Sequence, residues 1–456
     1  MKENSKKIRT PPGPRGDPLL GNLRDIYKSP LDFLVKCAHE YGGITRLKIL
    51  NIPIYFVADH ELVHEILTSR HAIFPKSDVF LAALRKAVGR GLVTNTGESH
   101  RRQRRLLQPA FHRGRMPNYS RVMSEHVDDM LVQWQDGETR DIVSEMTNLT
   151  MYIAARIFFS ADVKSDARKV GNAVNILQDC IWKEFNGGIL LPDWLPLPFK
   201  IQRKKNMRIL YSIIQDIIRR KSSLSGTIDD PSREDLLATL LHARDENGEG
   251  MEEKQLYDEI LTLFLAGHET VSTALSWFWY VLSREPEAEK KLHCELDENI
   301  QNGDFSMETL ENLPYLRRCI LETLRLYPSA WFIGIRESMA ETSLGEYRVK
   351  KGSYILISPY AMHRLPRYFP DPERFDPDRF TPENEKKIPG GAYIPFGGGP
   401  RNCIGSYFAM TELTLLIAKI ASSYRLVRDT DAPVKPEARV TLLLRPGLSM
   451  RLEKRK

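Results

Sequence analysis

Apolar residues recur at helical spacing through most of the chain and at strand spacing near its two ends. A spacing of three and four residues dominates from about Asp59 to Leu326, which predicts a largely helical segment. β-Branched and aromatic residues cluster at Ile44–Ile49 and Pro53–Val57, which predicts two short strands. Helix is expected again after Cys403, as far as about Tyr424. Further short strands are expected at Tyr347–Val349, Tyr354–Ile357, Val440–Leu444 and Leu448–Leu452.

The most apolar long stretch, Leu261 to Leu282, lies in a helix predicted from Gln255 to Leu282, which would span roughly 42 Å at ~1.5 Å per residue. Its middle contains Gly267, Glu269 and Thr270. Glycine costs a helix interior up to about 1 kcal/mol relative to alanine, and a buried carboxylate and hydroxyl add a desolvation cost. These unfavourable residues favour a function: space for a ligand at the glycine, and proton transfer or hydrogen bonding by the other two. The alternative is a kinked helix with incidental polar residues.

The chain contains no repeats and no linker long enough to separate independent domains. Breaks in the helical pattern fall near Gly89–Gly97, Gly187–Pro198, Ser222–Pro231 and Asn247–Gly250. We therefore expect a mainly α protein with a smaller β-rich region, in a single domain over residues 1–456. The β-rich part is assigned mostly to residues 1–58 and 328–400, and the helical body to 59–327 and 403–424.

Composition narrows the class of protein. Of the 456 residues, 42% are hydrophobic and 27% charged, as in ordinary globular proteins. The five cysteines are scattered and none forms a Cys-x-x-Cys pair, which argues against a disulfide framework or a zinc site and favours a reducing compartment. The first ten residues are polar and basic, so no signal peptide or anchor is predicted. We expect a soluble, cytoplasmic chain, although a relative whose anchor had been removed would look similar.

Positive charge is concentrated in one segment. Between Arg85 and Arg121 there are ten Lys or Arg residues and one acid, Glu98. Two interpretations are open. The segment is either a solvated basic helix face or a docking face for an acidic protein partner. Docking is plausible because complementary charges speed the encounter of two proteins. Nucleic-acid binding is not favoured, since aromatic interleaving and a reading motif are lacking. The densest part consists of Arg101, Arg102, Arg104 and Arg105, followed by Arg113 and Arg115.

One cysteine lies behind a glycine-rich turn, in the string from Phe396 to Gly405. A cysteine near glycines is often only a small buried hydrophobe. As a metal ligand, however, Cys403 would have to be a thiolate, and the helix predicted to follow it would favour negative charge. Gly397 and its neighbours have no Cβ, so the backbone can turn sharply and approach a flat macrocycle. Arg401 is expected to meet a carboxylate on the edge of that macrocycle.

The string from Phe396 to Gly405 resembles the cysteine-ligand loop of the cytochrome P-450 family almost position for position, and the resemblance covers nearly the whole chain. It implies the P-450 fold around a buried haem b, with the Cys403 thiolate as axial ligand. The segment from Ala266 to Thr270 resembles the family's oxygen-activation motif, which implies catalytic roles for Gly267, Glu269 and Thr270. The other residues expected to contact haem are Phe396, Gly397, Arg401, Gly405, His100, Arg104 and Arg336.

Two further motifs carry the resemblance. Glu322 and Arg325, otherwise a surface pair worth ~0.2–0.5 kcal/mol, resemble the family's Glu-x-x-Arg, with Arg374 as third partner. They would form a buried ion network that supports the cysteine loop. His100 and Arg104 occupy the positions of the family's Trp-x-x-x-Arg contact to a haem propionate. Histidine replaces tryptophan here, a departure from the family pattern.

The resemblance implies a monooxygenase that inserts one oxygen atom from O2 into a lipophilic substrate such as a fatty acid, terpenoid or steroid. Electrons would come from a separate acidic ferredoxin, flavodoxin or reductase, since the sequence contains no nucleotide fingerprint. Haem-thiolate peroxygenases, peroxide isomerases or dehydratases, and non-catalytic haem sensors remain alternatives. The predicted pocket residues, each of which would also suit the core, are Phe80, Leu84, Phe264, Leu265, Ala266, Ala330, Trp331, Phe332, Leu443 and Leu444.

Overall fold

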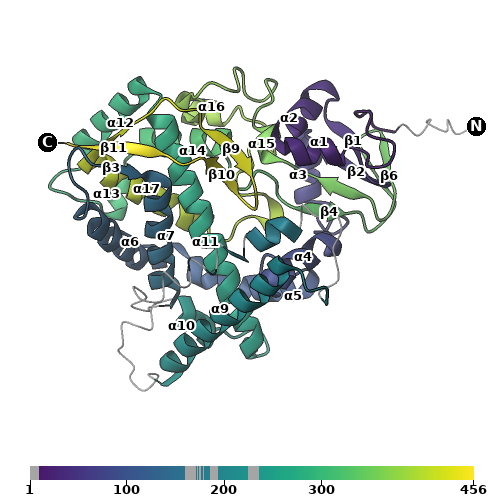
Figure 1. The fold of residues 1–456 in the computed structure, drawn as a ribbon, viewed down its shortest axis with the longest axis horizontal. Helices are drawn as coiled ribbons and strands as arrows, with labels where there is room; N and C mark the ends of the chain where they lie inside the picture. Colours follow the sequence, from purple (N-terminus) through teal and green to yellow (C-terminus); the bar gives the residue numbers. More distant parts are fainter. Residues whose placement is uncertain are drawn as a thin grey trace, which may run out of the picture. The chain divides into compact units, whose positions relative to one another are not determined.

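The computed structural model describes residues 10–159, 194–223 and 236–455, together with 171, 173, 176, 177 and 179–184 (Figure 1). Two predicted breaks, Gly187–Pro198 and Ser222–Pro231, lie largely outside the described residues. The chain forms two compact units: Met1–Phe80 with Leu324–Cys403, and Leu81–Thr323 with Ile404–Lys456. Each unit thus combines segments that are far apart in the sequence.

A four-stranded sheet forms the centre of the first unit, in the order β1-β2-β7-β4. Strands β1 and β2 form an antiparallel hairpin, β7 pairs with β2 in parallel, and β4 pairs with β7 antiparallel. Leu47, Phe56 and Ile355 are completely buried, which explains why these β-branched and aromatic runs form strands. The strand bounds are β1 Ile44–Ile49, β2 Ile52–Val57, β4 Ile335–Glu337, β5 Thr342–Leu344, β6 Tyr347–Val349 and β7 Tyr354–Leu356.

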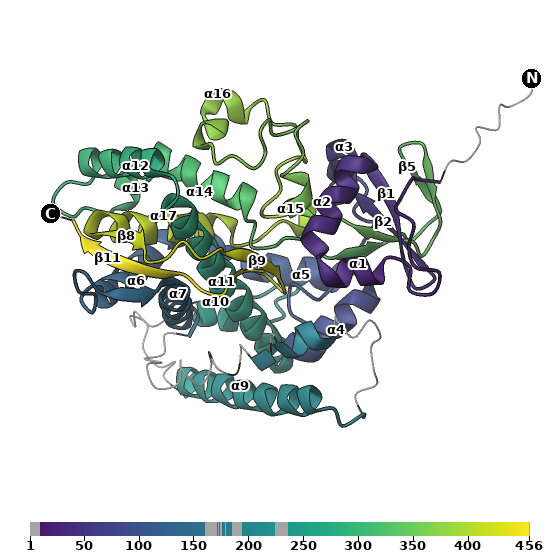
Figure 2. The same cartoon turned by 45° about the horizontal axis from the view of Figure 1, so that its top comes forward.

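Short helices accompany this sheet. Figure 2 shows α1 and α2 beside β1 and β2. The side chain of Asp59 caps α3 by accepting from the backbone N–H groups of Glu61 and Leu62, which fixes where that helix begins. The bounds in this unit are α1 Leu23–Lys28, α2 Pro30–Glu40, α3 His60–Leu67, α15 Pro359–Met362, η4 Pro377–Phe380, α16 Pro382–Glu385 and η5 Gly399–Arg401.

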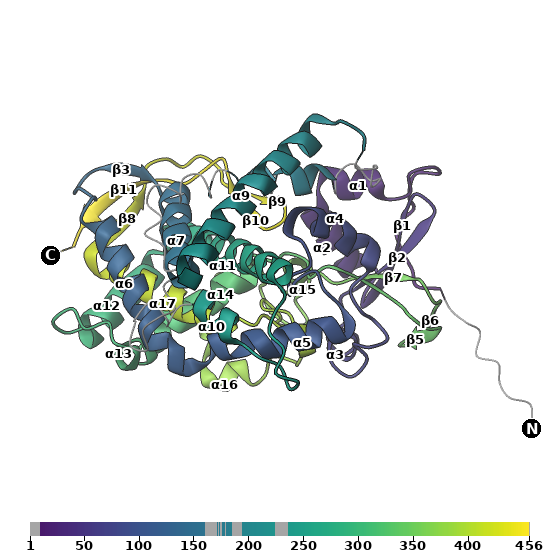
Figure 3. The same cartoon turned by 90° about the horizontal axis from the view of Figure 1, so that it is seen from below.

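The second unit is built around α11, Glu253–Leu282, which confirms the long helix predicted from the sequence. It packs mainly against α7 and also against α17 and α10 (Figure 3). Trp277, Phe278 and Trp279 are each at most 2% exposed, because neighbours cover α11 on all sides. The other helices whose described residues lie mainly here are α4 Asp78–Val88, α5 Gly97–Leu107, α6 Met116–Leu131, α7 Ile142–Phe159, α9 Pro198–Ser223, α10 Leu236–His242, α12 Pro286–Asn299, α13 Met307–Glu311, α14 Pro314–Leu326 and α17 Ser406–Ser423, with η1 Gln108–Phe111 and η2 Arg113–Arg115.

The same unit has two small sheets. One has the strand order β3-β11-β8, and the other is the β9–β10 hairpin. Strands β10 and β11 confirm the predicted C-terminal strands. Strands β3, β8 and β9 were not predicted, because they are only three to five residues long. The bounds are β3 Thr139–Asp141, β8 Tyr424–Arg428, β9 Lys435–Ala438, β10 Leu442–Arg445 and β11 Ser449–Lys454. Within the part of the chain that the structure describes, we find no helix long and apolar enough to cross a membrane.

The side chain of Arg325 is completely buried near the end of α14. Its guanidinium donates to the carbonyl oxygens of His363 (2.8 Å), Pro372 (2.7 Å) and Arg374 (3.1 Å). Arg374 therefore contacts Arg325 through its backbone, while its own side chain is exposed. The prediction that the Arg374 side chain joins a buried ion network is wrong, because the backbone supplies the acceptors. Glu322 is also completely buried, as the predicted ion network requires and unlike the alternative of a surface pair.

Replacing Arg325 by Met should lower the free energy of unfolding by about 3 kcal/mol or more, because three buried carbonyl groups lose a charged donor. Arg374→Ala, which keeps the backbone acceptor, should change it by no more than about 0.5 kcal/mol. Urea unfolding followed by circular dichroism measures both changes. Equal losses in the two variants would contradict this arrangement.

Candidate haem-thiolate site

Backbone hydrogen bonds hold the cysteine loop as a tight turn. The N–H of Cys403 donates to the carbonyl of Phe396 (2.9 Å), and the N–H of Gly397 donates to the carbonyl of Ile394 (3.0 Å). The side chain of Cys403 is exposed at the end of this turn, and Phe396 is half-buried. A sulfur that is presented to the outside by a fixed backbone is available for an axial bond to a metal.

Glycine is required in this loop because of its protein neighbours. Gly399 has a φ of +63°, and a Cβ on it would lie 1.8 Å from the carbonyl oxygen of Leu67 at the end of α3. Gly397 has a φ of +74°, which also favours glycine. The approach of α3, rather than the expected closeness to a macrocycle, therefore accounts for Gly399.

A buried histidine connects Arg325 to the cysteine loop. The ring of His363 accepts a hydrogen bond at Nε2 from the N–H of Ile394 (3.0 Å), so its proton lies on Nδ1, which donates to the carbonyl of Arg325 (3.2 Å). Burial and the nearby Arg325 charge lower the pKa of His363 to about 3, which keeps the ring neutral. Because Ile394 in turn accepts from Gly397, these bonds lead from α14 to the turn that presents Cys403.

The other cysteines differ from Cys403 in their surroundings. Cys37, Cys180 and Cys319 are buried. Burial raises the pKa of Cys37 to about 12 and raises the pKa of the other two, so these thiols stay protonated and inert near neutral pH. Cys294 is exposed, but it lies within α12, far in sequence from the glycine-rich turn. The structure thus leaves Cys403 as the thiol best suited to bind a metal.

Three basic side chains of the first unit lie near one another. Lys76 and Arg336 face each other in a backbone bridge, and burial together with the charges of Arg401 and Arg336 lowers the pKa of Lys76 to about 7. Arg336 is 3% exposed; one of its NH groups donates to the carbonyl of Phe74 (2.9 Å), and its Nε has no hydrogen-bond partner. Burial lowers the pKa of Arg336 to about 10. An orphaned buried donor within such a cluster fits an anion, such as the propionate groups of haem.

On α11, the polar groups of the predicted motif have protein partners. The hydroxyl of Thr270 donates to the carbonyl of Ala266 (2.7 Å), and one carboxylate oxygen of Glu269 accepts from the hydroxyl of Thr441 (2.9 Å). A Cβ on Gly267 would come within 3.0 Å of the ring of Phe158 on α7. The glycine therefore has a packing reason besides the ligand space expected from the sequence.

His268 has a structural role in the same motif. It is 2% exposed, its Nδ1 is 2.9 Å from the carbonyl of Phe264, and burial lowers its pKa. The ring is therefore neutral near pH 7 and packs against Phe264, with 5.1 Å between the ring centroids. His268 is thus more deeply buried than its neighbours in the sequence, Glu269 and Thr270, which are half-buried.

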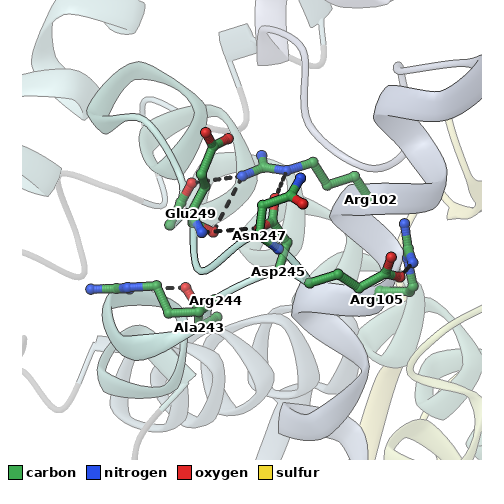
Figure 4. Close-up of polar contacts among 9 residues, drawn as sticks. Arg102, Arg105, Ala243, Arg244, Asp245, Asn247 and Glu249 are labelled. Carbon is green, nitrogen blue, oxygen red and sulfur yellow. Dashed lines mark hydrogen bonds and ion pairs between the residues drawn. The ribbon is translucent and has the colours of Figure 1, made fainter.

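Three arginines of the predicted basic docking face have acidic partners. Arg102 lies 2.5 Å from a carboxylate oxygen of Asp245 and also donates to the backbone of the loop that follows α10 (Figure 4). Arg105 pairs with Glu246, and Arg101 pairs with Glu98. Two of these partners, Asp245 and Glu246, are distant in the sequence, whereas Glu98 lies within α5 itself. Arg101 and Arg102 therefore each have an acidic partner, and their role in docking stays a prediction.

The remaining candidates on α5 lie on one face. His100 is 6% exposed and Arg104 is half-buried, one helical turn later. Their contact with a haem propionate stays a prediction.

The predicted pocket residues separate into groups within each unit. In the first unit, the rings of Phe80 and Phe332 pack edge to face at 5.8 Å, and those of Trp331 and Phe332 lie at 4.5 Å, with Ala330 half-buried beside them in sequence. In the second unit, Leu84 and Leu265 pack in one cluster. Its other members are Ala87, Val88, Ile181 and Val440.

Burial distinguishes the other predicted pocket residues. Phe264 is 1% exposed and Leu444 is 3% exposed, which favours a core position for both. Leu443 is half-buried. Ala266 is exposed in the middle of α11, between the half-buried residues Leu265 and Gly267, as expected for a residue beside a ligand space.

Sequence reasoning missed four residues that shape the site. Lys76 and His363 have no motif that distinguishes them from other basic residues. Thr441 lies within the predicted strand at Val440–Leu444, but nothing in the pattern pairs it with Glu269. A signal did exist for Arg379: the string Pro377-Asp-Arg-Phe repeats the Pro-Glu-Arg-Phe pattern five residues later, and its arginine is half-buried and donates to the carbonyl of Asp371 (2.9 Å).

Comparisons with known proteins show the family of this chain. The family model described as Cytochrome P450 matches residues 11–451, so the chain belongs to the cytochrome P450 family. It is 35% identical to cyclooctat-9-en-7-ol 5-monooxygenase of Streptomyces melanosporofaciens over 91% of this chain and 88% of the relative. It is 32% identical to pentalenene oxygenase of Streptomyces avermitilis over 100% of this chain and 99% of the relative. A retinoic-acid-bound cyanobacterial P450 shares the fold, with a TM-score of 0.87 and 26% identity over 98% of this chain and 100% of that one.

The protein is therefore a cytochrome P450 monooxygenase, and its cofactor is haem with a cysteine thiolate as axial ligand. The residues described above fit this group, because the structure supplies an exposed thiol on a fixed loop and an orphaned buried arginine donor. The mainly α fold with small sheets is confirmed as well.

Replacing Lys76 by Met should speed the loss of haem several-fold, because one positive charge of the Lys76–Arg336–Arg401 cluster no longer faces the propionates. Transfer of haem from the holoprotein to an excess of apomyoglobin measures this rate. Lys351→Met, at an exposed lysine of the same unit, is the matched control and should leave the rate unchanged. An unchanged rate in the Lys76 variant would show that this cluster does not hold the cofactor.

Proposed function

We propose that Cys403 binds the haem iron and that the chain inserts one oxygen atom of O2 into a C–H bond of a lipophilic substrate. The second oxygen atom leaves as water, with two electrons from a separate donor protein and two protons from solvent. When bound, the haem supplies oxygen activation, which the thiolate favours by donating electron density. The observation that carries the proposal is the exposed Cys403 thiol at the end of a hydrogen-bonded turn, next to the start of α17.

The chain's own residues have three tasks in this reaction. Lys76, Arg336 and Arg401 hold the carboxylates of the cofactor. Glu269 passes protons inward from solvent, and the hydroxyl of Thr270 presents a proton donor in the ligand space beside Ala266. In the structure that hydroxyl bonds the carbonyl of Ala266, a local helix bond that it can exchange for a ligand at little cost.

We propose a cyclic terpenoid as the substrate class. The curated relatives act on cyclooctat-9-en-7-ol and pentalenene, as their names state. Apolar side chains at Leu84, Leu265 and Val440 suit such a molecule, since burial of its surface provides most of the binding free energy. A fatty acid would need a partner for its carboxylate, and the chain offers no candidate among the residues of this apolar cluster.

The alternatives from the sequence are less well supported. A peroxygenase or a peroxide isomerase needs no proton delivery, yet this chain keeps an acid and an alcohol together on α11, with Glu269 held by Thr441. A haem sensor needs neither residue. Oxygen uptake coupled to product, with a surrogate redox partner, separates these classes from a monooxygenase.

Reducing the purified holoprotein and adding carbon monoxide should give the strongly red-shifted Soret band of thiolate-bound haem. Cys403→Ser should abolish that band, because a hydroxyl does not replace the thiolate. Cys294→Ser, at the other exposed cysteine, is the matched control and should retain it. A normal thiolate spectrum in the Cys403 variant would disprove the proposed ligand.

The electron donor is proposed to be an acidic ferredoxin or flavodoxin that docks around Arg113. This side chain is exposed on η2, and its guanidinium lies 4.8 Å from the ring centre of Tyr407, four residues after Cys403 in the sequence. No ion-pair partner of Arg113 is found among the described residues, unlike Arg101, Arg102 and Arg105. An unneutralised charge steers an acidic partner more strongly.

Arg113→Glu should slow reduction by an acidic ferredoxin several-fold at low ionic strength, and the difference should shrink at high salt, because salt screens exposed charges. Arg101→Glu is the matched control: it makes the same change of charge on α5, away from Tyr407 in the sequence, and should have the smaller effect. Stopped-flow reduction under carbon monoxide measures the rate. Should the Arg101 variant be the slower one, docking lies on α5 instead.

A further inference from the structure

The carboxylate of Glu269 is held by a residue from the other end of the chain. The hydroxyl of Thr441 donates to its Oε1 at 2.9 Å, across 172 residues of sequence. Thr441 is 4% exposed and lies just before β10, whereas Glu269 is half-buried in the middle of α11. A hydrogen bond to a charged acceptor is stronger than one between neutral groups, so this contact fixes how the carboxylate points.

The position of Thr441 is itself fixed. It belongs to the turn of the β9–β10 hairpin, where Ala438 pairs with Leu442 and the N–H of Arg439 donates to the carbonyl of Thr441 (2.9 Å). The indole of Trp277, on the same helix as Glu269, donates to the carbonyl of Leu442 (2.7 Å). The hairpin is thus attached to α11 at two points, about 12 Å apart along the helix.

The same turn touches the apolar cluster. Val440, directly before Thr441, packs against the same buried cluster as Leu84 and Leu265. Leu265 lies one helical turn before Glu269, so it shares that face of α11. Of two successive residues in the hairpin turn, Val440 therefore contacts the apolar cluster and Thr441 contacts Glu269, the proposed proton carrier.

We propose that Thr441 is a positioning residue that sets the orientation of the Glu269 carboxylate for proton delivery. Without its hydroxyl, the carboxylate of a half-buried glutamate regains rotamer freedom and points in several directions. The hydroxyl also retains the carboxylate on the hairpin side of α11 between proton transfers. This inference rests on the proposed function, because it takes Glu269 to act beside the bound cofactor.

The test uses the C–O stretching band of carbon monoxide bound to the reduced holoprotein, which responds to nearby charge and needs no known substrate. Glu269→Ala should shift this band. Thr441→Val, which replaces the hydroxyl by a methyl group of similar size, should shift or split it, because the freed carboxylate takes several orientations. Thr441→Ser, which keeps a hydroxyl, should restore one band near its original position.

The double variant Thr441→Val with Glu269→Ala should match Glu269→Ala alone, since no carboxylate remains to be positioned. A purely structural role for Thr441 would instead shift the band in both backgrounds, and that result overturns the proposal. An unchanged band in Thr441→Val, beside a shifted one in Glu269→Ala, overturns it too.

If Glu269→Ala itself leaves the band unchanged, Glu269 does not act beside the cofactor, and both the relay and this inference fail while the Cys403 test stands. The red-shifted Soret band of each variant shows that it has folded around thiolate-bound haem. If Thr441→Val does not fold, Thr441→Ala takes its place with the same expected outcomes.

Discussion

The buried guanidinium of Arg325 determines how the cysteine loop is held. It gathers three backbone carbonyls from segments that have no regular secondary structure of their own to satisfy them. One of these belongs to His363, whose neutral ring extends the same set of bonds to Ile394 at the start of the loop. Isolated buried charge is costly, so this arginine is stable only when all of these acceptors are in place. The acceptors that hold the loop are therefore backbone groups. The side chains of the residues that supply them can change without changing the geometry of the loop.

The motif on α11 shows how one set of residues meets both structural and chemical demands. Gly267 admits the ring of Phe158, and Thr270 satisfies its hydroxyl within the helix. Each feature therefore has an ordinary structural reason. The exposure of Ala266 within a helix whose other apolar residues are mostly covered is what distinguishes the site from a well-packed core.

The sequence predicted the elements that have strong local signals. The strand at Ile44–Ile49 and the helix α11 agree closely with the structure, because their apolar spacing is long and regular. The cysteine loop was also predicted, from the resemblance to a known family. Arg374 was misassigned because a motif does not tell whether a residue meets Arg325 through its side chain or through its backbone carbonyl.

Interactions between distant segments could not be predicted. The charges of α5 looked unpaired because their acidic partners, such as Asp245 and Glu246, follow about 140 residues later. Lys76 and Arg336 meet only because a bridge joins their backbones. Such pairings depend on how the chain folds back on itself, which hydrophobic periodicity along the chain does not specify.

The turn of the β9–β10 hairpin has a consequence for how this protein can change over evolution. Because Val440 and Thr441 are consecutive residues, a change at Val440 that reshapes the apolar cluster also displaces the hydroxyl of Thr441. A substitution there would then change two properties at once: the position at which the substrate is oxidised, and the fraction of electrons that ends in product. Divergence toward a new substrate would be expected to proceed first through α4, where Leu84 belongs to the same cluster and the acid is not disturbed.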